Sequence, residues 1–348
     1  VSHGVEKRSK VRSRIVADQL VKLIKEADHV VIMGHRMSDL DAIGSAEGVL
    51  RICKICDVPA VIAVRRDATL AGSLIDALCK AGQRDDFIDP KDALPIISKR
   101  TLCIVVDTYQ AGLVESKEIL EKCGRVAVID HHRKGVGYIQ NPDLVCHEPY
   151  SSSASELVTE LLQYVGERDD KPNRVEAEGL LSGIMLDTRD FTLHTGVRTF
   201  EAAAALRRYG AETERVRQLF DVTMVEYNAK AGLVEKAKMY RNCAISIGGE
   251  VAAEARVAIA QAANDLLTIQ GVDASFVAVQ VGTGVNVSAR SLGAVNVQVI
   301  MESLGGGGHQ TMAAAQLKHI TPEAARSRIE GAIDKYYASQ KKGGAEGK

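Results

Sequence analysis

Three short apolar runs, at residues 29–34, 103–106 and 126–129, each end in side chains that can bind a metal ion. Buried strands of a parallel sheet read as unbroken Val and Ile runs, and ligands collect at the carboxyl ends of such strands. The acidic and histidine residues at these ends are His35, Asp39, Asp41, Asp107, Asp130, His131 and His132. This set predicts a site for hard cations and makes phosphoryl chemistry the first hypothesis.

The spacing of His35, Asp39 and Asp41 favours a turn between a strand and a helix, because a helix would place positions 39 and 41 on different faces. Asp187 ends a buried helical run and adds one more carboxylate. These ligands are too many for one ion, so we expect two metals with a bridging carboxylate. Oxygen and nitrogen ligands without thiolate favour Mn²⁺, with Mg²⁺ or Fe²⁺ as alternatives. The competing interpretation is that each acid caps a helix.

A second cluster lies far downstream and combines Ser288 and Arg290 with a run of four glycines that ends at His309. Backbone N–H groups of Gly305, Gly306, Gly307 and Gly308 could converge on an anion with no side chain in the way. The Arg290 guanidinium could hold a phosphate, and His309 could add a hydrogen bond. The small residues 313–315 predict close packing beneath this loop. The alternative is a flexible glycine linker.

The elements that must position these residues follow from periodicity. Strands and helices alternate in the first 130 residues, which predicts an α/β fold with a parallel sheet and helices on both faces. The expected strands are 29–34, 59–64, 102–107 and 125–129, and the expected helices are 11–27, 41–56, 70–81 and 113–122. Residues 151–209 are mostly helical in pattern, and Ser152, Ser153 or Ser155 is expected to cap the first of these helices.

The pattern changes after residue 210. We expect a first domain over residues 1–210, a linker helix over 211–230, a second and smaller α/β domain over 231–340, and a disordered tail over 341–348. The strands expected in the second domain are 239–247, 276–281 and 285–290, and its expected helices lie near 257–269, 295–303 and 322–338.

Composition limits the classes of function. The 348 residues carry 44 Lys and Arg against 45 Asp and Glu, which argues against a protein that coats long nucleic acid but not against binding of a small anionic nucleotide. No apolar stretch reaches the roughly 18 residues of a membrane span, and the charged N-terminal segment is unlike a secretory signal. Seven cysteines, an odd number, in apolar settings favour reduced thiols and the cytoplasm, and Cys53 and Cys56 are interpreted as helix cysteines instead of zinc ligands. Because the chain begins with Val1, we expect it to be a piece of a longer protein.

The triplet Asp130-His131-His132, together with the other acids and His35, resembles the DHH phosphoesterase superfamily. The run Gly305–His309 and residues 288–290 are similar to the DHH-associated substrate-binding domain. Within this group, residues 33–44, 148–156 and 186–191 resemble the GdpP-type cyclic-di-AMP phosphodiesterases, and the resemblance extends from about residue 11 to residue 337.

The resemblance implies a role for each site residue. His35, Asp39 and Asp107 would hold one Mn²⁺, and Asp41, Asp107, His131 and Asp187 would hold the other, so that Asp107 bridges the two. His132 would face the scissile phosphate, and Asp130 would orient a histidine. The residues implied in substrate binding are His132, Ser288, Arg290, Gly305, Gly306, Gly307, Gly308 and His309.

The implied reaction is hydrolysis of a cyclic dinucleotide, cyclic-di-AMP, to linear pApA by water activated between two metal ions. Three alternatives are a nanoRNase and pAp phosphatase acting on short linear oligonucleotides, a non-catalytic nucleotide sensor, and a family II pyrophosphatase, which would lack the glycine run. A homodimer is a further possibility. In this family two membrane helices, a PAS-like domain and a degenerate GGDEF domain precede the catalytic module. The full-length parent would therefore be membrane-anchored, with this module in the cytoplasm.

Overall fold

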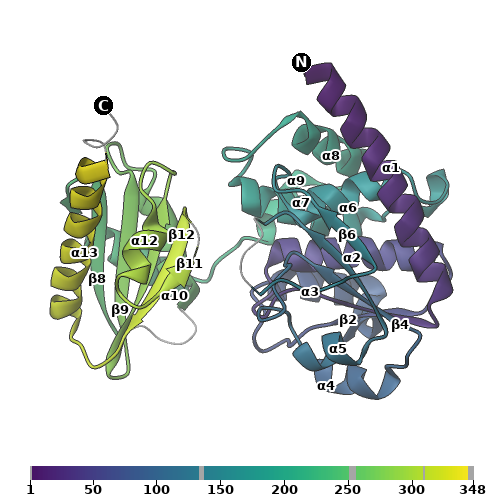
Figure 1. The fold of residues 1–348 in the computed structure, drawn as a ribbon, viewed down its shortest axis with the longest axis horizontal. Helices are drawn as coiled ribbons and strands as arrows, with labels where there is room; N and C mark the ends of the chain where they lie inside the picture. Colours follow the sequence, from purple (N-terminus) through teal and green to yellow (C-terminus); the bar gives the residue numbers. More distant parts are fainter. Residues whose placement is uncertain (1, 133–136, 251–255, 309, 344–348) are drawn as a thin grey trace. The chain divides into compact units, whose positions relative to one another are not determined.

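The computed structural model describes residues 2–132, 137–250, 256–308 and 310–343. The chain forms two compact units, residues 1–221 and 222–348 (Figure 1). Each unit contains its own six-stranded sheet.

The sheet of the first unit is parallel throughout, with strand order β3-β2-β1-β4-β5-β6. Its strands are β1 (His29–Met33), β2 (Ala60–Ala63), β3 (Phe87–Ile88), β4 (Thr101–Val106), β5 (Arg125–Asp130) and β6 (Leu144–His147). The parallel sheet predicted from the sequence is confirmed. The sequence did not predict β3 and β6, which are the two edge strands, because β3 has only two residues and β6 alternates between buried and half-buried side chains.

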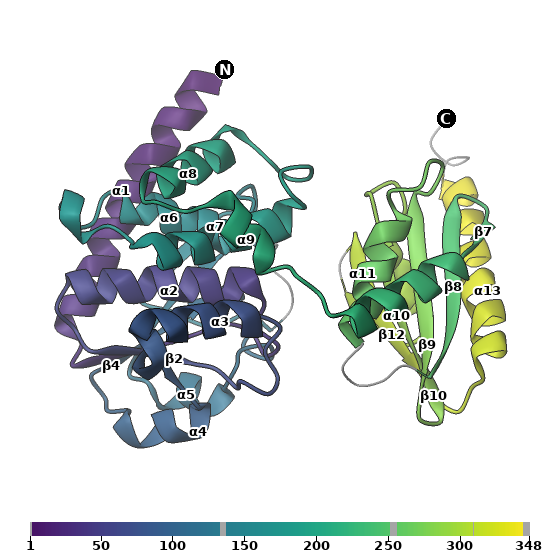
Figure 2. The same cartoon turned by 180° about the vertical axis from the view of Figure 1, so that it is seen from behind.

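Helices cover both faces of this sheet. They are α1 (Ser2–Glu26), α2 (Leu40–Ile55), α3 (Gly72–Leu78), α4 (Pro90–Ala93), α5 (Lys117–Lys122), α6 (Ala154–Leu162), α7 (Arg174–Thr188), α8 (Val197–Arg208) and α9 (Thr213–Gln218). Figure 2 shows α2 beside α7 on one side of the sheet, with α4 and α5 on the other. Helix α5 starts four residues later than expected, because Ser116 caps it by accepting a hydrogen bond from the N–H group of Ile119.

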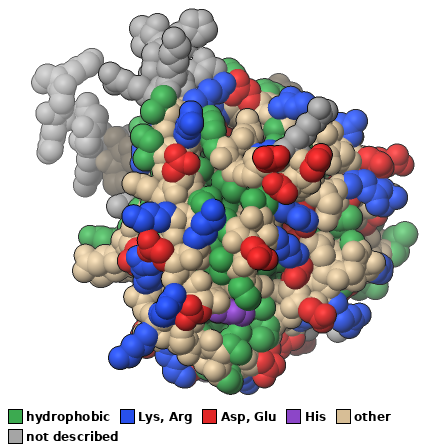
Figure 3. Space-filling model, turned by 90° about the vertical axis from the view of Figure 1, so that its right-hand side faces the viewer, with side chains coloured by type: hydrophobic (Ala, Val, Ile, Leu, Met, Phe, Trp, Pro, Cys, Tyr) green, Lys and Arg blue, Asp and Glu red, His purple; other side chains and the backbone are tan. Residues whose placement is uncertain are grey.

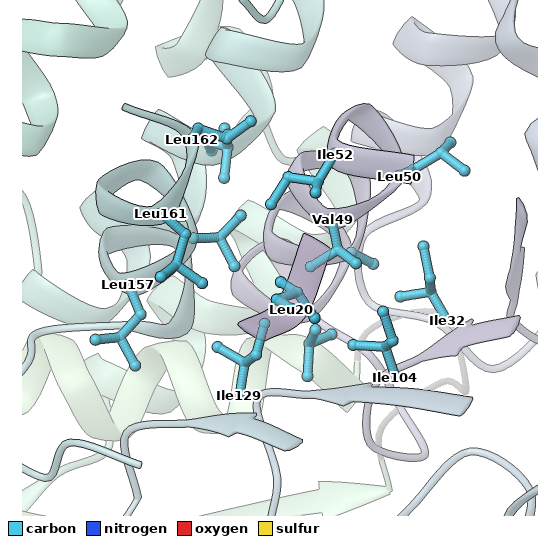
Figure 4. Close-up of a cluster of buried hydrophobic side chains, with 14 of the residues drawn as sticks. Leu20, Ile32, Val49, Leu50, Ile52, Ile104, Ile129, Leu157, Leu161 and Leu162 are labelled. Carbon is cyan, nitrogen blue, oxygen red and sulfur yellow. The ribbon is translucent and has the colours of Figure 1, made fainter. Parts of the chain in front are cut away.

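The larger core of the first unit lies between the sheet and helices α1, α2, α6 and α7. Alternate strand residues such as Ile32 point into it, and their neighbours such as Val31 enter a second core on the opposite face. Each fully buried Ile or Leu contributes about 1.5–3 kcal/mol relative to an exposed one. Figure 4 shows the centre of this core, with Leu20, Ile32, Val49, Leu50, Ile52, Ile104, Ile129, Leu157, Leu161 and Leu162 labelled.

Helices α2 and α7 approach each other closely because both carry glycine at the crossing. A Cβ atom on Gly44 would lie 2.4 Å from the carbonyl oxygen of Gly179, so no larger residue fits there without a backbone shift. Asp41 lies near the start of α2 and Asp187 near the end of α7. The close crossing therefore helps to bring these two carboxylates together.

Two buried carboxylates, those of Glu47 and Glu176, share the amide group of Gln83 between α2, α7 and a π-helical turn at Cys79–Gln83. Gln83 Nε2 donates to Glu47 Oε1 at 2.5 Å and to Glu176 Oε1 at 3.0 Å. Arg51 neutralises Glu176 through an Nε–Oε2 hydrogen bond of 2.8 Å. Burial, and then the charge of Glu176, raises the pKa of Glu47 to about 8. Glu47 is therefore largely protonated at neutral pH.

We expect Glu47→Gln to flatten the dependence of the unfolding free energy on pH. Folding raises the pKa of Glu47 from the unfolded-state pKa of about 4.5 to about 8. Its contribution to the unfolding free energy is therefore fully present below pH 4.5 and is lost as the pH rises through about 8. In the wild type this loss amounts to at most about 1.4 kcal/mol per pH unit. Urea unfolding of both proteins from pH 5 to pH 9 measures the difference. Parallel pH profiles would contradict the protonated state of Glu47.

The second unit has a mixed sheet with strand order β11-β12-β10-β9-β8-β7, in which only the β8–β9 pairing is parallel among the described strands. Its strands are β7 (Lys238–Tyr240), β8 (Cys243–Glu250), β9 (Ala274–Val281), β10 (Gly284–Ser291), β11 (Gly307–Gly308) and β12 (Met312–Leu317). Its helices are α10 (Met224–Glu235), α11 (Arg256–Leu266), α12 (Val297–Glu302) and α13 (Pro322–Gly343).

Two expectations about this half of the chain are wrong, those for the linker helix and for the start of the disordered tail. The single linker helix over 211–230 is instead two helices, α9 in the first unit and α10 in the second, and Thr223 caps α10 by accepting from the N–H group of Glu226. The close packing expected of residues 313–315 is confirmed, although they form strand β12: a Cβ atom on Gly306 would lie 2.1 Å from the carbonyl oxygen of Ala314, and one on Gly308 would lie 2.5 Å from Cα of Ala313. Helix α13 continues to Gly343, so residues 341–343 are helical, and residues 344–348 lie outside the described residues.

Charges of both signs are interspersed on the face of the first unit seen in Figure 3. This mixture does not favour the binding of long nucleic acid on that face. None of the helices in the described ranges is long and apolar enough to span a bilayer. All seven cysteines are free thiols, and Cys53 lies buried within α2.

Candidate metal centre

The candidate site lies where the sheet of the first unit reverses its winding. The strand order changes direction between β1 and β4, and ligands bind at such points beyond the carboxyl ends of the strands. His35 follows β1, Asp107 follows β4, and His131 follows β5. The topology therefore places the residues of all three sequence clusters at one edge of the sheet.

An outer group consists of His35, Asp39 and Asp107, whose ligand atoms all lie within 4.8 Å of one another. His35 Nε2 is 3.4 Å from Asp107 Oδ2 and 3.8 Å from Asp39 Oδ1. Asp39 also caps α2, accepting hydrogen bonds from the N–H groups of Asp41 and Ala42. For Asp39 the helix-cap interpretation is therefore confirmed, and the cap fixes its carboxylate beside His35.

An inner group consists of Asp41, Asp107, His131 and Asp187, whose ligand atoms also lie within 4.8 Å of one another. His131 Nε2 is 3.1 Å from Asp187 Oδ2, 3.4 Å from Asp107 Oδ1 and 3.9 Å from Asp41 Oδ2. Asp107 belongs to both groups and directs Oδ2 to His35 and Oδ1 to His131. It adopts a left-handed backbone conformation with φ of 57°, which is strained for most residues but tolerated by Asp. A carboxylate that bridges two metal ions must direct one oxygen to each ion, and the two oxygens of Asp107 are arranged in this way.

Electrostatics shows that the cluster needs positive charge. Burial, and then Asp107 and Asp187, raises the pKa of Asp41 well above its usual value. Burial opposes the charged form of His35, but the nearby carboxylates of Asp107 and Asp39 outweigh it and raise its pKa to about 11. Burial likewise opposes ionisation of Asp107, but His131 and His35 hold the pKa of Asp107 well below its usual range. Protons on the histidines thus compensate the carboxylates, and divalent cations could replace them.

The donor set fits such cations. Asp107 Oδ1 and His131 Nε2 are buried and have no hydrogen-bond partner among the described residues. Buried polar atoms normally have partners, so these two are candidates for metal coordination. Carboxylate oxygen and imidazole nitrogen without thiolate suit Mn²⁺, Fe²⁺ or Mg²⁺.

His132 has a different environment from His131. Its Nδ1 lies 2.8 Å from Asp130 Oδ1, and its side chain is 44% exposed against 13% for His131. His147 Nε2 lies 2.5 Å from the carbonyl oxygen of His132 and holds the backbone there. Asp130 thus orients His132, which is the more accessible histidine of the pair. The sequence did not predict this contact between His147 and His132, because His147 is not spaced from the other acids and histidines as a metal ligand would be.

In the second unit the structure brings Ser288 and Arg290 together on β10. Arg290 Nη1 donates to Ser288 Oγ at 3.1 Å and to the carbonyl oxygen of Ala289 at 2.9 Å. Only 9% of Arg290 is exposed. Its guanidinium is thereby held in one orientation at the end of the strand.

The glycine run is only partly available for anion binding. The N–H groups of Gly305 and Gly306 donate to Glu302 and Met301 and end α12, with Gly305 at φ of 80°. The expectation that these two groups converge on an anion is therefore wrong. Gly307 and Gly308 form β11 against β12, which packs against them. His309 lies outside the described residues.

Comparison with known proteins agrees with this architecture. Residues 29–184 match the DHH family, N-terminal domain, and residues 250–338 match the DHHA1 domain. The chain therefore belongs to the DHH family and carries a DHHA1 domain after its DHH domain.

Two curated relatives with high sequence identity to this chain are named cyclic-di-AMP phosphodiesterases. The chain is 45% identical over 347 residues to the cyclic-di-AMP phosphodiesterase GdpP of Geobacillus thermodenitrificans, covering 98% of this chain and 52% of that protein. It is 40% identical over 344 residues to the cyclic-di-AMP phosphodiesterase PdeA of Listeria monocytogenes, covering 97% and 52%. The chain thus spans about half the length of these relatives. A solved exopolyphosphatase-related protein from Bacteroides fragilis shares the fold, with a TM-score of 0.79 at 21% identity over 94% of this chain and 98% of that one.

Proposed function

We propose that this chain is a metal-dependent phosphodiesterase that hydrolyses cyclic-di-AMP to linear pApA. The observation that carries the proposal is the pair of ligand groups that share Asp107 at the switch point of the sheet. Relatives that are 40–45% identical and named cyclic-di-AMP phosphodiesterases support the choice of substrate.

In this proposal two Mn²⁺ ions occupy the two groups. His35, Asp39 and Asp107 would hold one ion, and Asp41, Asp107, His131 and Asp187 the other. When bound, such ions lower the pKa of a water molecule towards neutrality and offset the charge of the phosphate. The protein would fix the positions of the two ions through their ligands. Asp39 accepts a hydrogen bond from the start of α2, and the backbone N–H group of Asp107 donates to the carbonyl oxygen of Ile129.

His132 would contact the scissile phosphate. Its ring is oriented through Nδ1 by Asp130, so its other nitrogen can donate to a phosphate oxygen. Arg290, with Ser288, Gly307, Gly308 and His309, would bind the other end of the substrate. Arg290 is suited to this task because its guanidinium is already held by Ser288.

We expect His132→Ala to retain both metal ions and to lose mainly kcat, by about 10²–10³-fold. The reason is that His132 would meet charge that develops only in the transition state. Metal stoichiometry measured beside kcat and KM tests this, with His319→Ala, an exposed histidine of the other unit, as the control. A variant that loses metal would show that His132 is a ligand instead.

The competing function is a nanoRNase that also acts on pAp. A non-catalytic sensor is disfavoured because the ligand groups are complete. Incubation of the protein with cyclic-di-AMP and Mn²⁺, followed by anion-exchange chromatography, tests the main proposal. We expect pApA to appear, and an unchanged cyclic-di-AMP peak would contradict it. The homodimer and the upstream membrane, PAS-like and GGDEF-like regions stay predictions from the resemblance.

A further inference from the structure

Asp41 is held by the first turn of a helix that is more than a hundred residues away in the sequence. Its Oδ2 accepts a hydrogen bond of 2.7 Å from the N–H group of Ala154, and its Oδ1 accepts one of 2.8 Å from Ser155. These are the first two residues of α6, where unpaired N–H groups and the helix dipole favour a negative charge. Asp41 is fully buried. Both of its carboxylate oxygens are therefore fixed by backbone atoms.

Helix α7 closes the remaining side of this carboxylate. A Cβ atom on Gly183 would lie 2.6 Å from Asp41 Oδ1, 2.8 Å from Asp41 Cα and 2.3 Å from Ser155 Oγ. Cβ atoms essentially never lie this close to other heavy atoms, and because one of the three contacts is to the Asp41 backbone, α2 or α7 would have to move. The absence of a side chain at residue 183 is therefore what lets the three helices meet at Asp41.

Glu156 holds the segment that leads into α6. Its buried carboxylate accepts hydrogen bonds from the hydroxyl of Ser151 at 2.9 Å, from the hydroxyl of Ser152 at 2.5 Å and from the hydroxyl of Thr199 at 2.7 Å. The N–H group of Ser152 also donates to it, at 3.2 Å. Ser153 caps the helix by accepting from the N–H group of Glu156. The position of the first turn, and with it the two donors to Asp41, is thus tied to Glu156.

We propose that Gly183 and Glu156 are positioning residues that set the orientation of Asp41 before any metal binds. The inference rests on the proposed function, since it takes Asp41 as a ligand of the inner ion. Asp39 differs, because it is 30% exposed and the hydrogen bonds that it accepts from described residues come from the first turn of its own helix. Disturbing Gly183 or Glu156 should therefore weaken one of the two metal positions and spare the other.

The test is titration of metal-free protein with Mn²⁺, in which binding is measured by calorimetry and by the electron paramagnetic resonance signal of coupled Mn²⁺ pairs. We expect the wild type to bind two ions. Gly183→Ala should lose about 10–100-fold in affinity for one ion, as is usual when a group that orients a ligand is changed, and should lose the coupled signal. Gly232→Ala is the matched control, because Gly232 lies inside helix α10 of the second unit and a Cβ atom there would meet no described atom within 4 Å.

Glu156→Gln is the second variant, and it decides the matter if Gly183→Ala does not fold. It keeps the shape of the side chain but weakens the anchor of the first turn, so affinity for the same ion should fall. Two Mn²⁺ ions bound with wild-type affinity by Glu156→Gln, or by a folded Gly183→Ala, would overturn the inference. If the wild type bound no Mn²⁺, the proposed function would be wrong, and this inference with it.

Discussion

Asp107→Asn should lower the turnover of cyclic-di-AMP by about a thousandfold or more, the largest effect expected of any single substitution in this chain. Asp107 is the one residue shared by the outer and inner ligand groups, so a single change removes a ligand from both. Asparagine is chosen because it tolerates the left-handed backbone found at this position, where φ is 57°. The variant should therefore fold.

The loss should appear in metal content as well as in rate. Elemental analysis is expected to find fewer than two ions in Asp107→Asn. Asp39→Asn changes a residue of the outer group alone, so it should lose one ion and show a smaller defect. Near-normal turnover with both ions retained would refute the bridging role of Asp107.

Complete removal of metal should abolish hydrolysis. The inner group has three carboxylates around one imidazole, and none of these four described side chains is a Lewis acid that could activate water in place of a cation. Activity should return with Mn²⁺ more than with Zn²⁺, which favours four ligands including thiolate, or with Ca²⁺, which favours six to eight oxygens. Stopped assays in chelator and after reloading measure this. Full activity in excess chelator, with no metal found by elemental analysis, would contradict a mechanism that uses two metal ions.

The parts of the site that could be predicted from the sequence are those set by local pattern. Unbroken apolar runs predicted the central strands because those strands are buried on both faces, and the acids followed at their carboxyl ends. The edge strands β3 and β6 gave no such signal. The serine-rich approach to α6 predicted a helix start, and the structure identifies Ser153 as its cap.

The contacts that could not be predicted join segments far apart in the sequence. Nothing local to Ala154 or Gly183 shows that they lie against Asp41, because helical periodicity indicates a buried face but not its partner. The glycine run was ambiguous for a related reason. Consecutive glycines suit an anion loop, a helix end or a close strand pairing equally, and Gly305 and Gly306 serve the end of α12.

The central claim is tested most directly by comparing kcat/KM for cyclic-di-AMP and for linear pApA, using the same Mn²⁺-loaded protein. Both substrates carry the same bases and the same phosphodiester chemistry, so the ratio reports which of them the site is built to cleave. We predict a larger kcat/KM for cyclic-di-AMP, with pApA accumulating in equal amount to the cyclic dinucleotide consumed. Faster consumption of pApA, or no hydrolysis of cyclic-di-AMP, would contradict the account and favour an oligonucleotide hydrolase.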